Sequence, residues 1–249
     1  MRITIFDGSP HMERGITNLM VEAFTAGALE AGAEVENIFL ADKEVKPCIG
    51  CLACWVKTPG RCIYRDAMDE LIPKIVASDV VGFATPLYID NVSGIMKNFM
   101  DRMIPVVDPH METDEHGESR HVRIHDKPRY VLAISNCGFP EQSHFEVLRV
   151  LFRRVARNMD CRLLAEIYRC GGPLLSASEP SLLPFVEQYK VLLHEAGKEA
   201  VSNLGLSDDT VARLEQPLLP NADYAELYRQ RLNQRFDQRL EELKEGKEG

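Results

Sequence analysis

Four cysteines stand close together in the segment "CIGCLACWVKTPGRC", which occupies residues 48–62. Two residues separate Cys48 from Cys51 and Cys51 from Cys54, and seven residues separate Cys54 from Cys62. Consecutive two-residue gaps let a backbone curl around a cubane and donate N–H groups to its sulfides. The spacing is therefore typical of a ligand set for a [4Fe–4S] cluster, with these four thiolates as the candidate metal ligands.

Two other interpretations of the cysteine segment stay open. A zinc knuckle is the weaker of them, because zinc sites usually separate two Cys-x-x-Cys pairs more widely. The second is a set of thiols that carry no metal and stay reduced or redox-labile. It gains support from the gap before Cys62, which is longer than in bacterial ferredoxins.

The segment "DGSPHMERGITN" (7–18) has the composition of a phosphate site. Its glycines and proline allow a tight turn, while Thr17 and Asn18 supply side-chain donors where a helix is expected to begin. Backbone N–H groups at a helix N-terminus, together with the helix dipole, suit a phosphate. The segment matches neither G-x-G-x-x-G nor G-x-x-x-x-G-K-[ST], so neither a dinucleotide nor a nucleoside triphosphate is indicated. Ordinary turn formation by Ser9 and N-capping by Thr17 or Asn18 is the alternative.

Apolar runs that alternate with amphipathic segments must position these two motifs. Runs rich in Val, Ile, Leu and Phe predict strands at 2–6, 34–40, 79–86, 129–138 and 162–170. Amphipathic segments predict helices at 17–32, 66–78, 93–103, 144–159 and 180–205. This alternation predicts an α/β fold, a doubly wound parallel sheet of five strands with helices on both faces. Ligands of such sheets bind beyond the carboxyl ends of the strands, which selects the loops 7–18, 85–94 and 135–143.

Two segments lie outside this alternation. Residues 104–128 form a long polar insertion between a helix and a strand, and loops of this length are usually lids, interface arms or disordered. Residues 206–249 are expected to be a helical extension, whose apolar seam packs on a neighbouring subunit or on the core. We therefore expect one domain over residues 1–205, with the insertion inside it, followed by the extension.

The composition is that of a globular protein with a full core, because 45% of the residues are hydrophobic and 27% are charged. A net charge of −9 argues against nucleic acid or an anionic membrane as partner, since both bind clustered Lys and Arg. No apolar run approaches the roughly 20 residues that span a bilayer, and the N-terminus lacks the features of a signal peptide. We therefore expect a cytoplasmic protein. In that compartment a cysteine cluster more often means metal or redox chemistry than disulfides.

Three segments together resemble the flavodoxin-like NAD(P)H-dependent FMN reductases. They are "GSP" after the first strand, "TPLYIDNVSGIMKNFMDR" (85–102) after the third, and the cysteine segment between them. The likeness covers about residues 1–200, and it points to the branch that includes the iron–sulfur flavoproteins. The resemblance implies a flavodoxin-like sheet with strand order 2-1-3-4-5, FMN as cofactor and NAD(P)H as co-substrate.

The resemblance also implies which residues bind FMN. Those that would hold the phosphate are Ser9, His11, Thr17 and Asn18. Those that would lie along the isoalloxazine ring are Pro86, Leu87, Tyr88 and Asn91, with Asn136, Cys137 and Gly138 closing the other side. The first loop departs from the usual pattern, because His11 stands where arginine is common and the order of Thr17 and Asn18 is reversed.

The function implied is transfer of electrons from NAD(P)H through FMN to a quinone, a nitro or azo compound, free flavin or a protein. No side-chain acid or base is required, because the protein positions and tunes the flavin. The alternative is an electron carrier in which FMN and the four-cysteine [4Fe–4S] cluster exchange electrons with a partner protein. A homodimer or homotetramer is implied, because flavin clefts in this family often lie at subunit interfaces.

Overall fold

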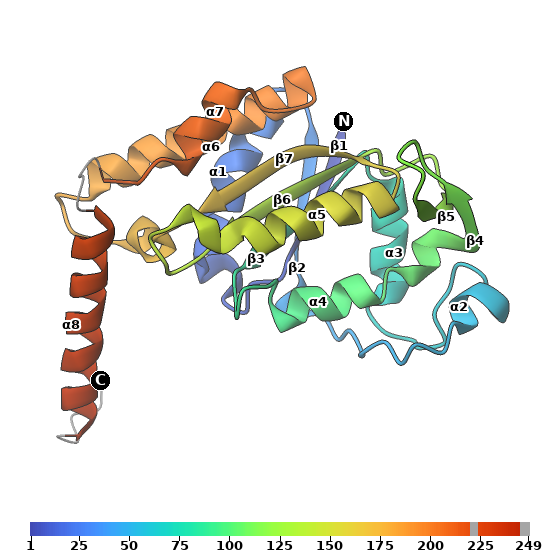
Figure 1. Cartoon of the computed structure of the whole chain (residues 1–249), viewed down its shortest axis with the longest axis horizontal. Helices are drawn as coiled ribbons and strands as arrows, with labels where there is room; N and C mark the ends of the chain where they lie inside the picture. Colours follow the sequence, from blue (N-terminus) through green and yellow to red (C-terminus); the bar gives the residue numbers. More distant parts are fainter. Residues whose placement is uncertain (220–223, 245–249) are drawn as a thin grey trace.

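A parallel five-stranded sheet forms the centre of the computed structural model, which describes residues 1–219 and 224–244 (Figure 1). Its strands are β1 (Arg2–Asp7), β2 (Glu34–Phe39), β3 (Val80–Pro86), β6 (Tyr130–Asn136) and β7 (Arg162–Arg169). They are arranged in the order β2-β1-β3-β6-β7, and every pair is parallel. Because β6 and β7 are the fourth and fifth strands of this sheet, the predicted flavodoxin-like order 2-1-3-4-5 is confirmed.

The apolar character of the strands follows from their place in the sheet. Every residue of β3, the central strand, is buried, as are all residues of β1 except the first. The edge strand β2 instead mixes exposed and buried positions. Strands covered on both faces must be apolar throughout, whereas an edge strand meets water. This difference explains why the inner strands are the easiest to recognise in the sequence.

Helices cover both faces of the sheet. The helices on one face are α1 (Ile16–Glu30), α6 (Leu183–Asn203) and α7 (Asp208–Glu215), and those on the other are α3 (Met68–Ala77), α4 (Gly94–Asp101) and α5 (Glu146–Asn158). Helices α1 and α6 approach so closely that an added Cβ on Gly27 would lie 1.8 Å from the carbonyl oxygen of His194. Backbone contact between α1 and α6 thus fixes the position of α1, whose first turn carries the predicted phosphate loop.

The polar insertion 104–128 folds into an antiparallel hairpin of β4 (Val107–Thr113) and β5 (Ser119–Arg123). Ion pairs attach the hairpin to α5. The Arg157 Nε lies 2.5 Å from the Asp114 carboxylate, and the Arg157 guanidinium holds the pKa of Asp114 far below its ordinary value. The sequence does not indicate this hairpin, because its strands are polar and its ion-pair partners lie elsewhere in the chain.

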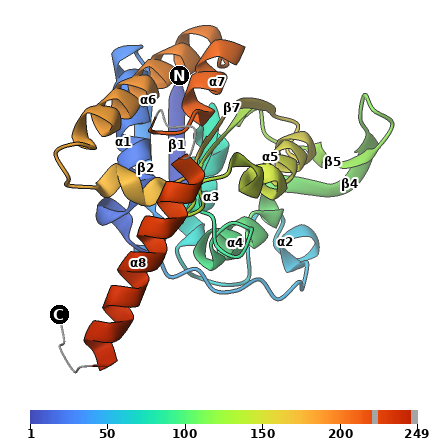
Figure 2. The same cartoon turned by 60° about the vertical axis from the view of Figure 1, so that its left-hand side comes forward.

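The C-terminal helix α8 (Tyr224–Lys244) projects away from the rest of the molecule (Figure 2). Tyr224 and Tyr228 are buried at its base, whereas Phe236 and Leu240 of the predicted apolar seam are exposed. The division into a domain over 1–205 and an extension over 206–249 stays a prediction, and within that extension residues 220–223 and 245–249 lie outside the described residues. None of the described helices combines the length and apolarity needed to cross a membrane.

Candidate functional site

The three predicted loops lie together at the carboxyl edge of the sheet, where hydrogen bonds join them. The Gly8 N–H donates to the Ala84 carbonyl at 2.8 Å, and the Ser93 hydroxyl donates to the Gly8 carbonyl at 2.7 Å. The first bond ties the first loop to β3, and the second ties it to the second loop. Ser93 also N-caps α4, since its oxygen accepts from the Met96 N–H. The sequence reasoning missed this role of Ser93, although a serine directly before a helix is its usual signal.

Asn136 joins the third loop to the other two. Its side-chain amide donates to the Thr17 hydroxyl oxygen at 2.8 Å, and its carbonyl accepts from the Leu87 N–H at 2.9 Å. Asn136 and Thr17 are buried and lie 119 residues apart in the sequence. One residue therefore holds the three loops in register, because it contacts the start of α1 and the end of β3 at once.

The first loop presents unused donors to an anion. The Ser9 oxygen accepts from the His11 N–H, which leaves the Ser9 hydroxyl hydrogen available. The helix α1 begins after Gly15, which supplies no side-chain cap, so the amides of its first turn have no capping group. Ser9 and Thr17 are buried, whereas the side chain of His11 is exposed. This arrangement is suited to a phosphate.

Asn18 is buried and engaged within the chain. Its amide nitrogen donates to the Glu13 carbonyl at 3.2 Å and to the Glu22 carboxylate at 2.8 Å, which uses both amide hydrogens. Its oxygen accepts from the Asn37 amide at 3.0 Å. In this geometry Asn18 braces the phosphate loop from behind.

Asp7 is a buried carboxyl group at the base of the first loop. It is 0% exposed, and its Oδ1 accepts from the Ser9 N–H at 2.7 Å. Its Oδ2 has no hydrogen-bond partner in the described structure. Burial raises the pKa of Asp7 to about 7, against a smaller opposite effect of the Ser9 N–H. The sequence reasoning did not single out Asp7, although a carboxyl group that ends an apolar strand is a recognisable signal.

The second loop makes a tight turn beyond β3. Pro86 and Leu87 are buried, while Tyr88 is 46% exposed and Asn91 is exposed. Tyr88 and Asn91 bridge each other, with N–H to carbonyl distances of 2.9 and 3.2 Å. Ile89, at the tip, is 97% exposed and has a φ of 48°. A β-branched residue in the left-handed region is strained, and such strain concentrates at functional sites.

Replacing Ile89-Asp90 with Asn-Gly is expected to stabilise the fold by about 1–2 kcal/mol. Both positions have positive φ, which asparagine and glycine adopt at little cost. Urea unfolding of this variant measures the gain. The matched control is Asn-Gly at Ser178-Glu179, where both residues are exposed, neither has a positive φ and no gain is expected. An unchanged midpoint in the turn variant would contradict the assignment of strain.

The end of β6 completes the third loop. Cys137 is buried, and its N–H donates to the Arg169 carbonyl of β7 at 3.0 Å. Gly138 is exposed. Gly138, Tyr88 and Asn91 are all exposed, so the edge that the three loops form is open to solvent. Behind these residues, backbone hydrogen bonds join the loops to one another.

The four cysteines of the second motif line one small cavity, which they share with Tyr64 and Arg102. Two left-handed residues, Gly50 and Leu52, curl the chain between the first three cysteines. The Gly50 N–H points at the Cys48 sulfur, 3.5 Å away. Burial raises the pKa of Cys54, and the neighbouring cysteines raise it further. These four side chains are thus brought together as the spacing predicted.

The cavity does not have the arrangement of a single-ion site. Within residues 1–219 and 224–244, no three His, Cys, Asp or Glu side chains are placed to hold one metal ion. Zinc requires four ligands about 2.3 Å from one point. A cubane cluster spreads its thiolates over four iron corners, so its ligands stand further apart. Four thiols that line one cavity are the donor set of a cubane cluster.

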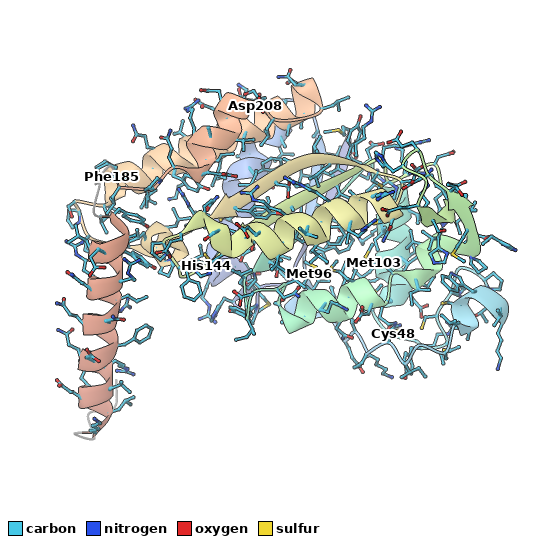
Figure 3. All side chains as sticks on the ribbon, viewed as in Figure 1. Cys48, Met96, Met103, His144, Phe185 and Asp208 are labelled. Atoms are coloured by element: carbon cyan, nitrogen blue, oxygen red, sulfur yellow. The ribbon has the colours of Figure 1, made fainter. Side chains whose placement is uncertain are left out.

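Helix α4 connects the two regions. It begins at Ser93, which contacts the first loop, and it ends at Arg102, which lines the cysteine cavity. Eight helical residues span roughly 12 Å. The carbonyl of Val45, just before the cysteine segment, accepts from the Asn98 amide of α4. In Figure 3, Cys48 lies near the Met103 end of α4, away from His144.

Residues 1–156 match the protein family described as NADPH-dependent FMN reductase. The chain belongs to this family. The match covers β1 to most of α5 and thus includes all three loops and the cysteine segment.

Curated relatives share part of the sequence. An iron–sulfur flavoprotein of Methanocaldococcus jannaschii is 42% identical over 106 residues, which are 43% of this chain and 53% of the relative. One from Methanosarcina thermophila is 33% identical over 104 residues, 42% of this chain and 53% of the relative. The chain spans about half the length of the curated relatives it matches.

Solved structures of similar fold extend further along the chain. An NAD(P)H:quinone oxidoreductase from Methanothermobacter marburgensis has a TM-score of 0.57 at 14% identity, over 83% of this chain and 98% of the other. An FMN-dependent NADH-azoreductase from Bacillus anthracis, solved with FMN, has a TM-score of 0.55 at 16% identity, over 82% and 99%. At these identities the likeness establishes the fold, which is the flavodoxin-like fold predicted.

Proposed function

We propose that this protein is an FMN-dependent oxidoreductase that takes electrons from NAD(P)H and passes them to an acceptor. The observation that carries the proposal is the joining of three loops at one sheet edge, beside a first helix whose N-terminus has no side-chain cap. Membership of the NADPH-dependent FMN reductase family supports the same chemistry.

The residues of the first loop fit the phosphate of FMN. The Ser9 hydroxyl and the first-turn amides of α1 would donate to it, and Thr17 would line the same pocket. His11, whose side chain is exposed, would reach the phosphate from the solvent side. Asn18 would act indirectly, since its amide hydrogens hold the loop.

The other two loops fit the flavin ring. Pro86 and Leu87 form an apolar wall, and Tyr88 would cover the ring from its exposed position. Asn91 and Gly138 would place polar groups at the ring edge, over a floor formed by Asn136 and Cys137. When bound, FMN supplies the hydride chemistry, and the chain orients it and excludes water. No side-chain acid or base is assigned.

Replacing Ser9 with alanine tests the phosphate site. A hydrogen bond to a charged group contributes about 1.5–3 kcal/mol, so the Kd for FMN is expected to rise about tenfold or more. Riboflavin, which lacks the phosphate, is expected to bind the variant and the unaltered protein alike. Flavin fluorescence titration measures both ligands, and Ser181→Ala at an exposed serine is the matched control.

Equal weakening of FMN and riboflavin by Ser9→Ala would refute the phosphate assignment while leaving the ring site intact. Oxidation of NADPH and NADH by the FMN-loaded protein, with a quinone or an azo dye as acceptor, tests the activity. A protein that binds no FMN, or that oxidises neither nucleotide, would overturn the proposal.

A second candidate function is favoured by the four thiols around one cavity. In this proposal Cys48, Cys51, Cys54 and Cys62 hold a [4Fe–4S] cluster, which exchanges electrons with FMN and with a partner protein. The relatives named iron–sulfur flavoproteins support it. One-electron exchange of this kind suits a carrier, whereas direct reduction of small molecules needs FMN alone.

Self-association is part of the proposal. The flavin rim is open at Tyr88, and the outer face of α8 exposes Phe236 and Leu240. A homodimer or homotetramer that covers these surfaces would shield both the flavin and the apolar seam. The cytoplasm remains the compartment predicted for this chemistry.

A further inference from the structure

Arg102 is a buried cation beside the cysteine cavity. It directly follows the last residue of α4. In the structure Arg102 is 2% exposed, one of the largest fully buried side chains of the described chain. A buried guanidinium is costly unless it is paired, so its contacts indicate what it does.

Those contacts attach Arg102 to the cysteine segment from both sides. Its Nη1 donates to the Asp66 carboxylate at 2.7 Å and its Nη2 at 3.1 Å, which is a bidentate pair. Its Nη1 also donates to the Lys46 carbonyl at 2.5 Å. The ring of Tyr64 lies 5.2 Å from the guanidinium carbon. Lys46 lies two residues before Cys48, and Asp66 lies four after Cys62, so Arg102 closes the loop that carries all four cysteines.

Arg102 keeps an unused N–H group at its Nε. Its Nε is buried and has no hydrogen-bond partner within the described residues. Arg102 lines the same cavity as the four cysteines, with the Cys62 thiol as its neighbour there. Burial lowers the pKa of Arg102, but Asp66 and Cys62 more than offset this effect, so it stays charged. The Nε–H of Arg102 therefore has no acceptor in the described structure, although it lies beside a cavity lined by four thiols.

We propose that Arg102 is a positioning residue for the [4Fe–4S] cluster, which donates its Nε–H to the Cys62 sulfur and raises the reduction potential of the cluster. This inference rests on the proposed cluster. Reduction adds one negative charge to the cluster, and a nearby buried cation stabilises that charge because the surrounding dielectric constant is low. Hydrogen bonds to ligand sulfurs act in the same direction.

Lysine could not replace Arg102. A lysine ammonium is a compact point charge, whereas the planar guanidinium binds the Asp66 carboxylate in a fork, donates to the Lys46 carbonyl and still directs its Nε–H elsewhere. The carboxyl end of α4 adds a reason for a cation, since helix C-termini carry partial negative charge that would oppose thiolates. Arg102 offsets that charge where the thiols gather.

The experiment compares cluster potentials. The full-length protein is loaded anaerobically with iron, sulfide and FMN, and the cluster is titrated with dithionite and followed by electron paramagnetic resonance. Arg102→Gln is expected to make reduction at least tenfold less favourable, a fall of about 59 mV for one electron. The matched control is Arg235→Gln, which removes an exposed arginine of α8 and should leave the potential unchanged.

A second variant guards against misfolding. Arg102→Gln leaves the Asp66 carboxylate buried without its partner, so Asp66→Asn/Arg102→Gln removes both charges together. The double variant is expected to shift the potential in the same direction by a smaller amount. Loss of the cluster with FMN retained in the double variant would also support a positioning role. Unchanged potentials at full iron content in both variants would overturn the inference.

The same measurements separate this inference from the proposed function. Iron and sulfide content of the unaltered protein report whether a cluster forms at all. A protein without iron refutes the cluster, and with it the role of Arg102, whereas an iron-loaded protein that is insensitive to Arg102 refutes only that role.

Discussion

Replacement of Cys54 with serine is expected to remove the iron from the protein and to leave FMN bound. Cys54 is buried within the cavity that all four cysteines line. A serine hydroxyl does not become an anionic ligand near neutral pH. The variant would hold the cubane by only three thiolates, and such a cluster is easily lost. We expect iron to fall from about four atoms per chain to below about one. Iron and acid-labile sulfide assays after anaerobic loading measure the loss.

The matched control for this prediction is Cys161→Ser. Cys161 lies outside the cavity, and its thiol contacts the Pro128 carbonyl. This variant should keep its iron and the brown colour of a cluster. FMN absorbance should be the same in both variants, because the first loop is attached to the other end of α4. If Cys54→Ser keeps its full iron content, the four-cysteine cavity is not the cluster site.

The second large effect is expected from Asp7→Asn. Burial raises the pKa of Asp7 from its ordinary value of 3.8 to about 7, so the folded state holds the proton more tightly than the unfolded chain. The stability that Asp7 contributes is therefore fully present below about pH 4 and is lost as the pH rises through about 7. The difference is on the order of 4 kcal/mol. The asparagine side chain of the variant stays neutral and keeps an acceptor for the Ser9 N–H.

Urea unfolding of the protein without FMN, at about pH 4 and about pH 8, tests this linkage. Asp7→Asn should be close to the unaltered protein at the lower pH and more stable at the higher one. Asp237→Asn, at an exposed carboxylate of α8, is the control and should be neutral at both. A stability difference that does not change with pH would mean that the pKa of Asp7 is the same in the folded and the unfolded chain.

The sheet was predictable from the sequence, because its inner strands are apolar on both faces. β1 and β3 are buried over almost their whole length, and only continuous apolar runs satisfy that requirement. The carboxyl edge then follows from topology, since parallel strands deliver their loops to one rim. The meeting of the loops that carry Thr17 and Asn136 is a consequence of this rule, whereas the hydrogen bond between the two side chains was not predicted.

What could not be predicted depends on which partner each side chain contacts. No local pattern indicates the pairing of Arg102 with Asp66, which lies 36 residues away in the sequence. Asn18 has the side chain of a phosphate ligand, yet Glu13 and Glu22 take up its amide hydrogens. The insertion 104–128 has no apolar alternation, because ion pairs to α5 help to hold its hairpin. In each of these cases the structural role of the residue is set by the side chain or carbonyl that it contacts.

The length of α4 sets the gap between the two proposed centres. Helix residues come in whole numbers, so an insertion or deletion within Gly94–Asp101 changes the gap in steps of about 1.5 Å and rotates Arg102 by about 100° each time. One added residue would therefore swing the guanidinium out of the cavity while moving it barely further from Ser93. The proposed distance between the two centres therefore cannot be adjusted finely through the length of α4, and only side-chain changes along the helix can do so.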